Sequence, residues 1–177
     1  MGSRKSCFDA AVPRSSSLAD AGEPPLSPDS RLPIPDSRPF SLPTRVYWED
    51  TDAGGVVYHA QYLAFLERAR TEWMRALGHG QEALRTAHGL VFVVRAMRID
   101  FRRPARLDDA LQVTAALSRC RRASIVFAQS ILRGGELLVD AEVRCAALEA
   151  STFRPRAIPD VLYQDLTRLV EPGAEDE

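Results

Sequence analysis

The chain has 177 residues, of which 45% are apolar and 27% charged, and its formal net charge is −1. This composition indicates a globular protein with a real core, and the small net charge argues against a nucleic-acid or membrane-surface partner. The three cysteines form no CxxC pair, which indicates free thiols in a cytoplasmic protein, and the sequence contains neither a metal motif nor an apolar run long enough to span a membrane.

Residues 1–42 differ in composition from the rest of the chain. They are rich in Pro, Ser and Asp and show no period of 2 or 3.6. Such a segment buries too little apolar surface to offset its ordering entropy, so we expect a disordered N-terminal extension. We expect the folded domain over residues 43–165 and an acidic C-terminal tail over residues 166–177.

The folded part is predicted to begin with a strand over Thr44–Asp50, with Val46 and Trp48 on one face. A loop rich in Asp and Gly follows. A long helix is then predicted over Ala60–Leu77, with a stop at Gly78 and a shorter helix over residues 81–87. The apolar residues of the long helix recur at spacings of three and four: Tyr62, Phe65, Leu66, Ala69, Trp73, Met74 and Leu77.

Strand patterns dominate from Leu90 to about Phe153. They cover residues 90–104, 107–120 and 123–148, and the last of these is divided by a hairpin turn at Gly134–Gly135. The chain closes with a proline-bounded segment that includes a short helix. One long helix packed on one antiparallel sheet is an α+β architecture. A single helix leaves sheet edges exposed, so we expect pairing with a second copy.

The stretch from Glu49 to His59 places two carboxylates, two glycines and a histidine at the start of the long helix. The first N–H groups of a helix lack intrahelical acceptors and carry partial positive charge, so they suit a phosphate or the oxygen of a polarised carbonyl. Asp52, a few residues upstream, would then serve as base or nucleophile across from these donors. The residues alone indicate an acyl or phosphate site.

Simpler roles exist for each of these residues. Asp50 is better explained as a brace for the loop, and Asp52 is open to the same reading. His59 fits equally well as a satisfied helix residue, and Tyr58 and Tyr62 fit packing roles. We expect Glu67 to pair within the helix, with Arg70 or Thr71.

A second candidate lies in the sequence CRRAS, Cys120–Ser124, where one strand ends and the next begins. Two arginines at a strand end suit phosphate binding. The alternative is an exposed turn with solvated charge.

The stretches RVYWEDTDAGGVVYHAQYLAFLERARTEWMRALG and FVVRAMRIDFRRPARLDD resemble the Tol-Pal-associated acyl-CoA thioesterases, a branch of the 4-hydroxybenzoyl-CoA thioesterase-like hotdog family. The resemblance runs from Thr44 to about Pro159. The string D-x-D-x-x-G-x-V-Y-H is far more specific than a lone Asp-Gly loop.

The resemblance implies a hotdog fold, in which an antiparallel sheet wraps one long helix, and a homodimer or homotetramer with active sites between subunits. It makes Asp52 the catalytic carboxylate and places the carbonyl-polarising backbone N–H at His59. It also implies substrate contacts at Gly54, Gly55, Val57, Tyr58 and Tyr62, and contacts to the CoA phosphates at Arg121, Arg122 and Ser124. It requires no metal and no cofactor, since CoA is part of the substrate.

The expected function is hydrolysis of an acyl-CoA thioester to a free acid and CoA. The alternative is a scaffold that binds acyl carrier protein or an envelope-complex partner, with residues 1–42 as its partner arm. Another hotdog chemistry, such as dehydration of an acyl thioester, ranks lower. The sequence leaves open the acyl length, the choice between CoA and acyl carrier protein, and whether Asp52 is a nucleophile or a general base.

Overall fold

The computed structural model of the chain describes residues 40–170. The predicted N-terminal extension and the acidic end of the tail lie largely outside the described residues. The elements are β1 (Phe40–Arg45), η1 (Trp48–Asp50), α1 (His59–Ala76), α2 (Gln81–His88), β2 (Leu90–Phe101), β3 (Ala110–Arg121), β4 (Ser124–Arg133), β5 (Glu136–Glu149) and α3 (Asp160–Thr167). The predicted long helix, the short helix after it and the hairpin at Gly134–Gly135 are confirmed.

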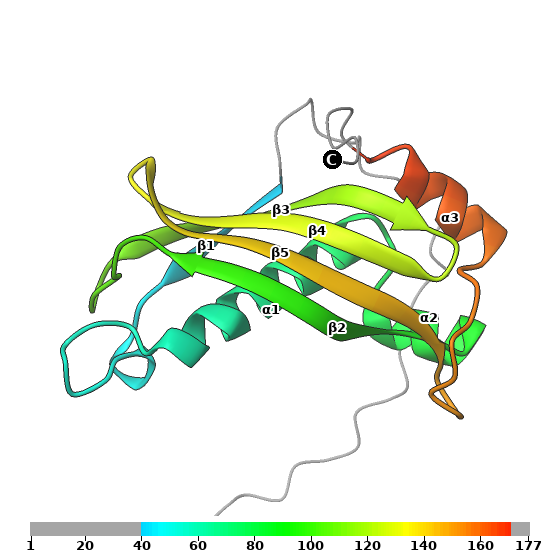
Figure 1. Cartoon of the computed structure of the whole chain (residues 1–177), viewed down its shortest axis with the longest axis horizontal. Helices are drawn as coiled ribbons and strands as arrows, with labels where there is room; N and C mark the ends of the chain where they lie inside the picture. Colours follow the sequence, from blue (N-terminus) through cyan, green and yellow to red (C-terminus); the bar gives the residue numbers. More distant parts are fainter. Residues whose placement is uncertain (1–39, 171–177) are drawn as a thin grey trace, which may run out of the picture. The chain divides into compact units, whose positions relative to one another are not determined.

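The five strands form one antiparallel sheet in the order β1-β3-β4-β5-β2. The helix α1 lies across one face of this sheet (Figure 1). A long helix held against an antiparallel sheet is the predicted α+β hotdog arrangement, which is confirmed.

The strand predicted over Thr44–Asp50 is wrong in position. The strand β1 ends at Arg45, and Trp48–Asp50 form a turn of 3-10 helix. Val46 is fully buried while Trp48 is 79% exposed, so the two side chains share no face. The strand begins at Phe40, ahead of the predicted start of the domain, and it tolerates Pro43 because it is an edge strand.

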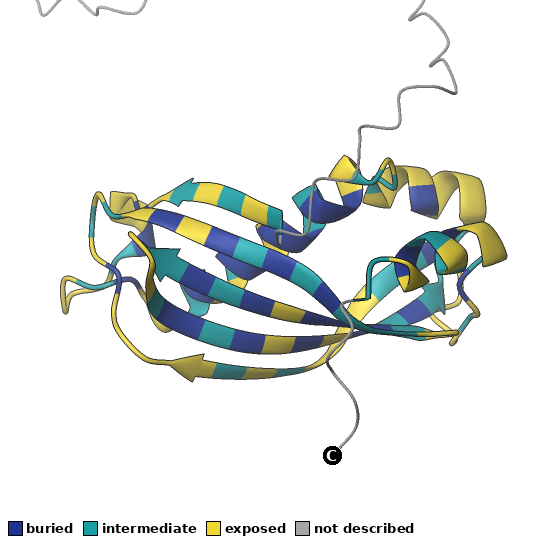
Figure 2. Ribbon diagram, turned by 90° about the horizontal axis from the view of Figure 1, so that it is seen from above, coloured by how far each residue is buried: buried dark blue, intermediate teal, exposed yellow. Residues whose placement is uncertain are grey.

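The core lies between α1 and the sheet. Alternate residues of β3, β4 and β5 point toward the helix and are buried, as the banded burial colours show (Figure 2). The ring of Trp73 on α1 meets the ring of Phe127 on β4 edge-on, with centroids 5.1 Å apart. Such aromatic pairs stabilise a core beyond the area that they bury.

The sheet is covered unevenly. The helix α1 packs mainly against β3 and β1. On the far edge strand β2, Val93, Val94 and Phe101 remain 38%, 42% and 50% exposed. The edge formed by β2 is therefore long and partly apolar.

The helix α3 closes the described part of the chain. Its residues Leu162 and Leu166 are buried, so packed structure continues past residue 165, where the sequence predicts a tail. Across residues 40–170, no helix combines the length and the apolar character that crossing a membrane requires.

Candidate active site

The residues from Thr51 to Tyr58, which we call the Asp52 loop, close on themselves immediately before α1. The Asp52 N–H donates to the Val56 carbonyl at 2.9 Å, and the Tyr58 N–H donates to the Asp50 carbonyl at 2.9 Å. These bonds bring the end of the loop back beside its beginning at Asp50. The loop is therefore attached directly to the N-terminal end of α1 (Figure 1).

Asp50 braces this loop from inside. It is only 2% exposed. Its carboxylate accepts the Tyr47 N–H at 2.7 Å and the Gln61 Nε2–H at 2.5 Å, which ties the loop entrance to the first turn of α1. The structure thus confirms the interpretation of Asp50 as a structural residue.

Asp52, by contrast, is exposed. Its Oδ1 accepts the Gly54 N–H at 2.8 Å, which fixes the direction of the carboxylate. Gly55 has a φ of +73°, the left-handed conformation that glycine adopts without strain. The loop therefore presents one oriented carboxylate to solvent.

The N-terminal end of α1, which follows the loop directly in the chain, supplies hydrogen-bond donors. The helix begins at His59, and Tyr58 makes no side-chain capping bond to it. The backbone N–H groups of a first helical turn have no intrahelical acceptor and lie at the positive end of the helix dipole. Both His59 and Tyr58 are exposed, and their ring centroids lie 4.4 Å apart.

Val57 and Tyr62 hold the loop against the segment that follows β2. The Val57 N–H donates to the Ala105 carbonyl at 2.9 Å, and the Ala105 N–H donates to the Tyr62 hydroxyl oxygen at 2.8 Å. The Tyr62 ring lies 5.6 Å from that of Phe101. Burial raises the pKa of Tyr62, although the bond from Ala105 opposes the rise. Tyr62 is thus a neutral supporting residue.

Asp109 is a supporting residue that sequence reasoning missed. Its carboxylate accepts the Arg106 N–H at 2.8 Å and forms an ion pair with Arg133 at 2.7 Å, so it shapes the segment that carries Ala105. Burial works against the charged carboxylate, but the bonds from Arg133 and Arg106 outweigh it and lower the pKa of Asp109. No local pattern distinguishes it from an ordinary loop aspartate.

The second candidate group lies at the other end of the sheet. Arg121 and Ser124 pair across the turn between β3 and β4, whereas the Asp52 loop adjoins the end where β2 finishes and β3 begins. The strand β3 has 12 residues, which spans roughly 40 Å. A single chain therefore does not bring the two groups together.

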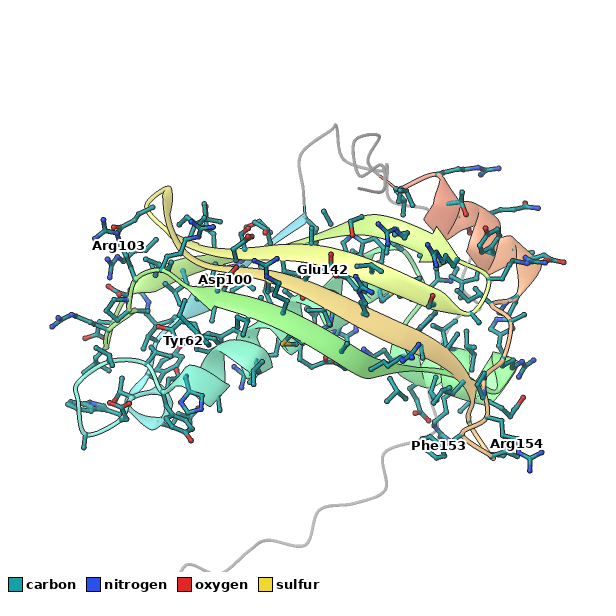
Figure 3. The ribbon with its side chains drawn as sticks, viewed as in Figure 1. Tyr62, Asp100, Arg103, Glu142, Phe153 and Arg154 are labelled. Atoms are coloured by element: carbon teal, nitrogen blue, oxygen red, sulfur yellow. The ribbon has the colours of Figure 1, made fainter. Side chains whose placement is uncertain are left out.

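Figure 3 shows the same two ends. Tyr62 and Arg103 lie at one end of the sheet, and Phe153 and Arg154 lie at the other.

Within the distant group, the two arginines differ. Arg122 forms an ion pair with Asp160 at 2.8 Å, and its guanidinium lies 4.8 Å from the centroid of the Tyr163 ring. It holds α3 in place. Arg121 is exposed.

Comparisons with known proteins agree with this architecture. The family described as the thioesterase-like superfamily matches residues 46–166. The chain is 47% identical over 120 residues to the acyl-CoA thioesterase YbgC of Haemophilus influenzae, a match that covers 68% of this chain and 88% of that protein. It is 48% identical over 121 residues to the acyl-CoA thioester hydrolase YbgC of Escherichia coli, covering 68% of this chain and 90% of that protein.

A solved structure of a related protein has the same fold. A probable thioesterase from Bartonella henselae matches with a TM-score of 0.65 and 41% identity, covering 67% of this chain and 98% of that one. The matched residues include the Asp52 loop, α1 and the strands from β2 to β5. The chain therefore belongs to the thioesterase-like superfamily and has its hotdog fold.

Proposed function

We propose that the protein is an acyl-CoA thioesterase that hydrolyses an acyl-CoA thioester to a free acid and CoA. One observation carries the assignment of the site. An exposed carboxylate, oriented by the Gly54 N–H, lies on a loop that is bonded to the start of a helix without a side-chain cap. The carboxylate supplies the base or nucleophile, and the helix supplies donors for a developing oxyanion.

Two routes use these groups. In the first, an Asp52 oxygen bonds to the acyl carbon, the carbon–sulfur bond breaks and the CoA thiolate takes a proton from solvent. Water then hydrolyses the anhydride. In the second, Asp52 takes a proton from a water molecule whose oxygen attacks the acyl carbon, and the proton passes to the departing sulfur. Both routes consume one water molecule and place negative charge on the carbonyl oxygen, which the α1 N–H groups stabilise.

The exposed imidazole of His59 has a lesser role in this proposal. The donor that polarises the carbonyl is the backbone N–H of His59, and the side chain orients substrate or water beside Tyr58. The exposed residues Gly54, Gly55 and Tyr58 shape the rim on which the thioester lies, and the buried Val57 holds that rim against Ala105.

We further propose that two copies pair through β2. This edge strand is long and carries exposed Val93 and Val94, whereas the opposite edge, β1, has six residues and is interrupted by Pro43. Antiparallel pairing of two β2 strands about a twofold axis sets the Phe101 end of one strand beside the Leu90 end of its mate.

This pairing resolves the separation of the two candidate groups. The turn with Arg121 and Ser124 lies at the same end of the sheet as the start of β2. In the pair, the turn of one chain therefore shares an end with the Asp52 loop of the other. We propose that Arg121 and Ser124, supported by Arg122, contact the CoA phosphates of the partner's substrate.

We assign the enzyme to the cytoplasm and to the Tol-Pal-associated branch. The string from Asp50 to His59 matches the pattern of that branch at every defined position. An acyl carrier protein bears the same kind of thioester, so the test of donors includes one.

The test is release of thiol from short, long and aromatic acyl-CoAs and from an acyl carrier protein thioester. Replacing Asp52 by Asn should lower kcat by about 10²–10⁴-fold, because the base or nucleophile is removed while the shape is kept. The matched control is Glu49→Gln, an exposed carboxylate three residues away, which should retain wild-type turnover. Equal turnover in wild type and Asp52→Asn, or no wild-type turnover on any donor, would contradict the proposal.

A further inference from the structure

A tight turn joins the end of β5 to the segment that leads to α3. It comprises residues 149–154, and we call it the β5–α3 turn. The Phe153 N–H donates to the Glu149 carbonyl at 2.8 Å, and the Glu149 N–H donates to the Arg154 carbonyl at 2.9 Å, so the turn is closed. Phe153 and Arg154 are both exposed, and they lie at the end of the sheet opposite Tyr62 (Figure 3).

Phe153 combines a strained backbone with an exposed side chain. Its φ of +54° lies in the left-handed region, where a Cβ atom comes too close to the following carbonyl oxygen. Glycine would adopt this conformation without strain. The residue is 65% exposed, so burial of the ring does little to offset the strain. A strained position that holds an aromatic ring in solvent indicates that the ring serves binding.

The base of the turn is held by several bonds. The Arg156 Nη1–H donates to the Glu149 carboxylate at 2.9 Å and to the Gly89 carbonyl at 3.2 Å. The Ala150 N–H donates to the same Gly89 carbonyl at 2.8 Å. Gly89 leaves room for this arrangement, because a Cβ atom there would lie 2.8 Å from the Glu149 Oε1. The turn is therefore attached to the junction of α2 and β2, which sets the position of its tip.

The strand order places this turn between two other features of the same end of the sheet. Glu149 of β5 pairs with Leu90, the first residue of β2. On the other side of β5, Ala146 pairs with Ser124, the first residue of β4. Ser124 belongs to the turn that we propose to contact the CoA phosphates. The β5–α3 turn thus lies between the edge strand β2 and that phosphate-contact turn.

In the proposed pair of chains, the reaction centre of the partner lies at this same end. Leu90 of one chain lies beside the partner's Phe101, and within a chain the Tyr62 ring lies 5.6 Å from the Phe101 ring. Tyr62 follows His59 within the first turn of α1. A path from the partner's β2 to the phosphate-contact turn crosses β2 and β5 and ends at β4. Its three steps of about 4.8 Å span about 14 Å.

We propose that the β5–α3 turn binds the pantetheine arm of an acyl-CoA that is hydrolysed at the partner's Asp52, with Phe153 packed against the arm. This inference rests on the proposed function and on the proposed β2 pair. The arm joins the thioester sulfur to the pyrophosphate through roughly 13 bonds, which span about 16 Å at about 1.2 Å per bond. Its reach matches the separation of the two groups, so an arm that joins them passes over the end of β5.

The pantetheine arm has surface that suits an aromatic ring. Its two methyl groups and its methylenes are apolar, and they leave water when they pack against the ring. This contact is remote from the reacting atoms, so it is equally strong in the ground state and the transition state. Phe153 therefore contributes to kcat/KM for substrates that carry the full arm and leaves kcat unchanged.

The decisive variant is Phe153→Gly, assayed with butyryl-CoA and with the butyryl thioester of N-acetylcysteamine. The second substrate keeps the thioester and the nearest amide but lacks the rest of the arm. We expect kcat/KM for butyryl-CoA to fall roughly tenfold, as the loss of an apolar contact by a large side chain implies. The value for the truncated thioester should not change. The melting temperature should not fall, because glycine adopts the left-handed conformation freely.

Two control variants separate the ring from its surroundings. Phe153→Tyr keeps an aromatic ring and should retain the wild-type kcat/KM on both substrates. Val161→Ala removes a side chain of α3 that is 69% exposed, next to Asp160 and its ion pair with Arg122. This variant should also leave both values unchanged, because it alters exposed apolar surface at the same end of the sheet without touching the β5–α3 turn.

An unchanged kcat/KM for butyryl-CoA in Phe153→Gly would overturn the inference. An equal fall on both thioesters, or a lower melting temperature, would do the same, since the ring would then support the protein and not the arm. These outcomes leave the proposed function intact, because wild type still hydrolyses butyryl-CoA. A monomeric wild type in sedimentation velocity overturns the β2 pair, and absence of wild-type turnover on every donor overturns the proposed function. Either result removes this inference as well.

Discussion

Gly54 and Gly55 are neighbours in the Asp52 loop, but the structure requires glycine at each for a different reason. A Cβ atom at Gly54 would lie 3.0 Å from the Asp52 Oδ1, closer than side chains ordinarily approach. A Cβ at Gly55 would meet no atom within 4 Å, but its φ of +73° is strained for other residues. Gly54 therefore makes room for the carboxylate, and Gly55 makes the turn.

Gly54→Ala should lower kcat roughly tenfold, because the new methyl group displaces the Asp52 carboxylate from its working position. The free energy of unfolding should change by less than about 1 kcal/mol, since the change sacrifices no left-handed glycine. Gly55→Ala is the contrasting variant and should cost about 1–2 kcal/mol of stability. Initial rates and urea unfolding separate the two effects. Unchanged kcat in Gly54→Ala would argue against an oriented Asp52.

At the scale of elements, the segment between β2 and β3 supports the site without entering it. Ala105 in this segment is bonded both to the Asp52 loop, through Val57, and to α1, through Tyr62. Asp109 holds the segment in shape through Arg133, which lies at the end of β4. The position of the loop thus depends on an ion pair that lies outside it.

Asp109→Asn should lower the free energy of unfolding at pH 7 by about 1–2 kcal/mol, because a partly buried hydrogen bond between charged groups is lost. The pKa of Asp109 is lower in the folded protein than in the unfolded chain. Its contribution is therefore complete above the unfolded-state pKa of about 4 and disappears as the pH falls through the lower folded-state value.

Urea unfolding across this range should show the stability gap between wild type and Asp109→Asn closing in acid. The control is Asp108→Asn, since Asp108 is exposed and has a φ of +66°, which Asn tolerates. A gap that persists at low pH would show that the charge of Asp109 is not its source.

At the scale of the whole molecule, the two edges of the sheet have different properties. The edge β1 is short and contains Pro43, features that discourage pairing with another strand. The edge β2 has 12 residues and partly exposed valines. The unpaired N–H and C=O groups of such an edge can pair with a strand of a second chain. Our proposal for the CoA contacts depends on that pairing.

Val94→Glu should convert the proposed dimer to a monomer, because each β2 strand would place a buried negative charge near that of its mate. The monomer should also have a kcat/KM lower by about tenfold or more, because the partner's contacts to the CoA phosphates are lost. Sedimentation velocity gives the oligomeric state. Ser41→Glu, which adds the same charge to the β1 edge, should remain a dimer. A dimeric Val94→Glu protein would place the interface elsewhere.

The sequence predicts those features that repeat locally. The apolar stripe predicts both ends of α1 to within one residue, because its buried residues recur every three or four positions. The strand β1 is misplaced, since it contains a proline and is followed by a turn whose residues alternate as a strand would. Arg70 falls on a polar position of the helix, and its burial depends on Gln129, 59 residues away. No local pattern reports such a contact.

The opposite placement of the Asp52 loop and the Arg121 turn has a consequence for inheritance. If each centre takes its carboxylate from one chain and its phosphate contacts from the other, a mixed pair made from two different defective alleles keeps one complete centre. A chain damaged at Asp52 and a chain damaged at Arg121 would then rescue each other, whereas two chains with the same defect would not. The geometry of one sheet thus determines which pairs of alleles complement.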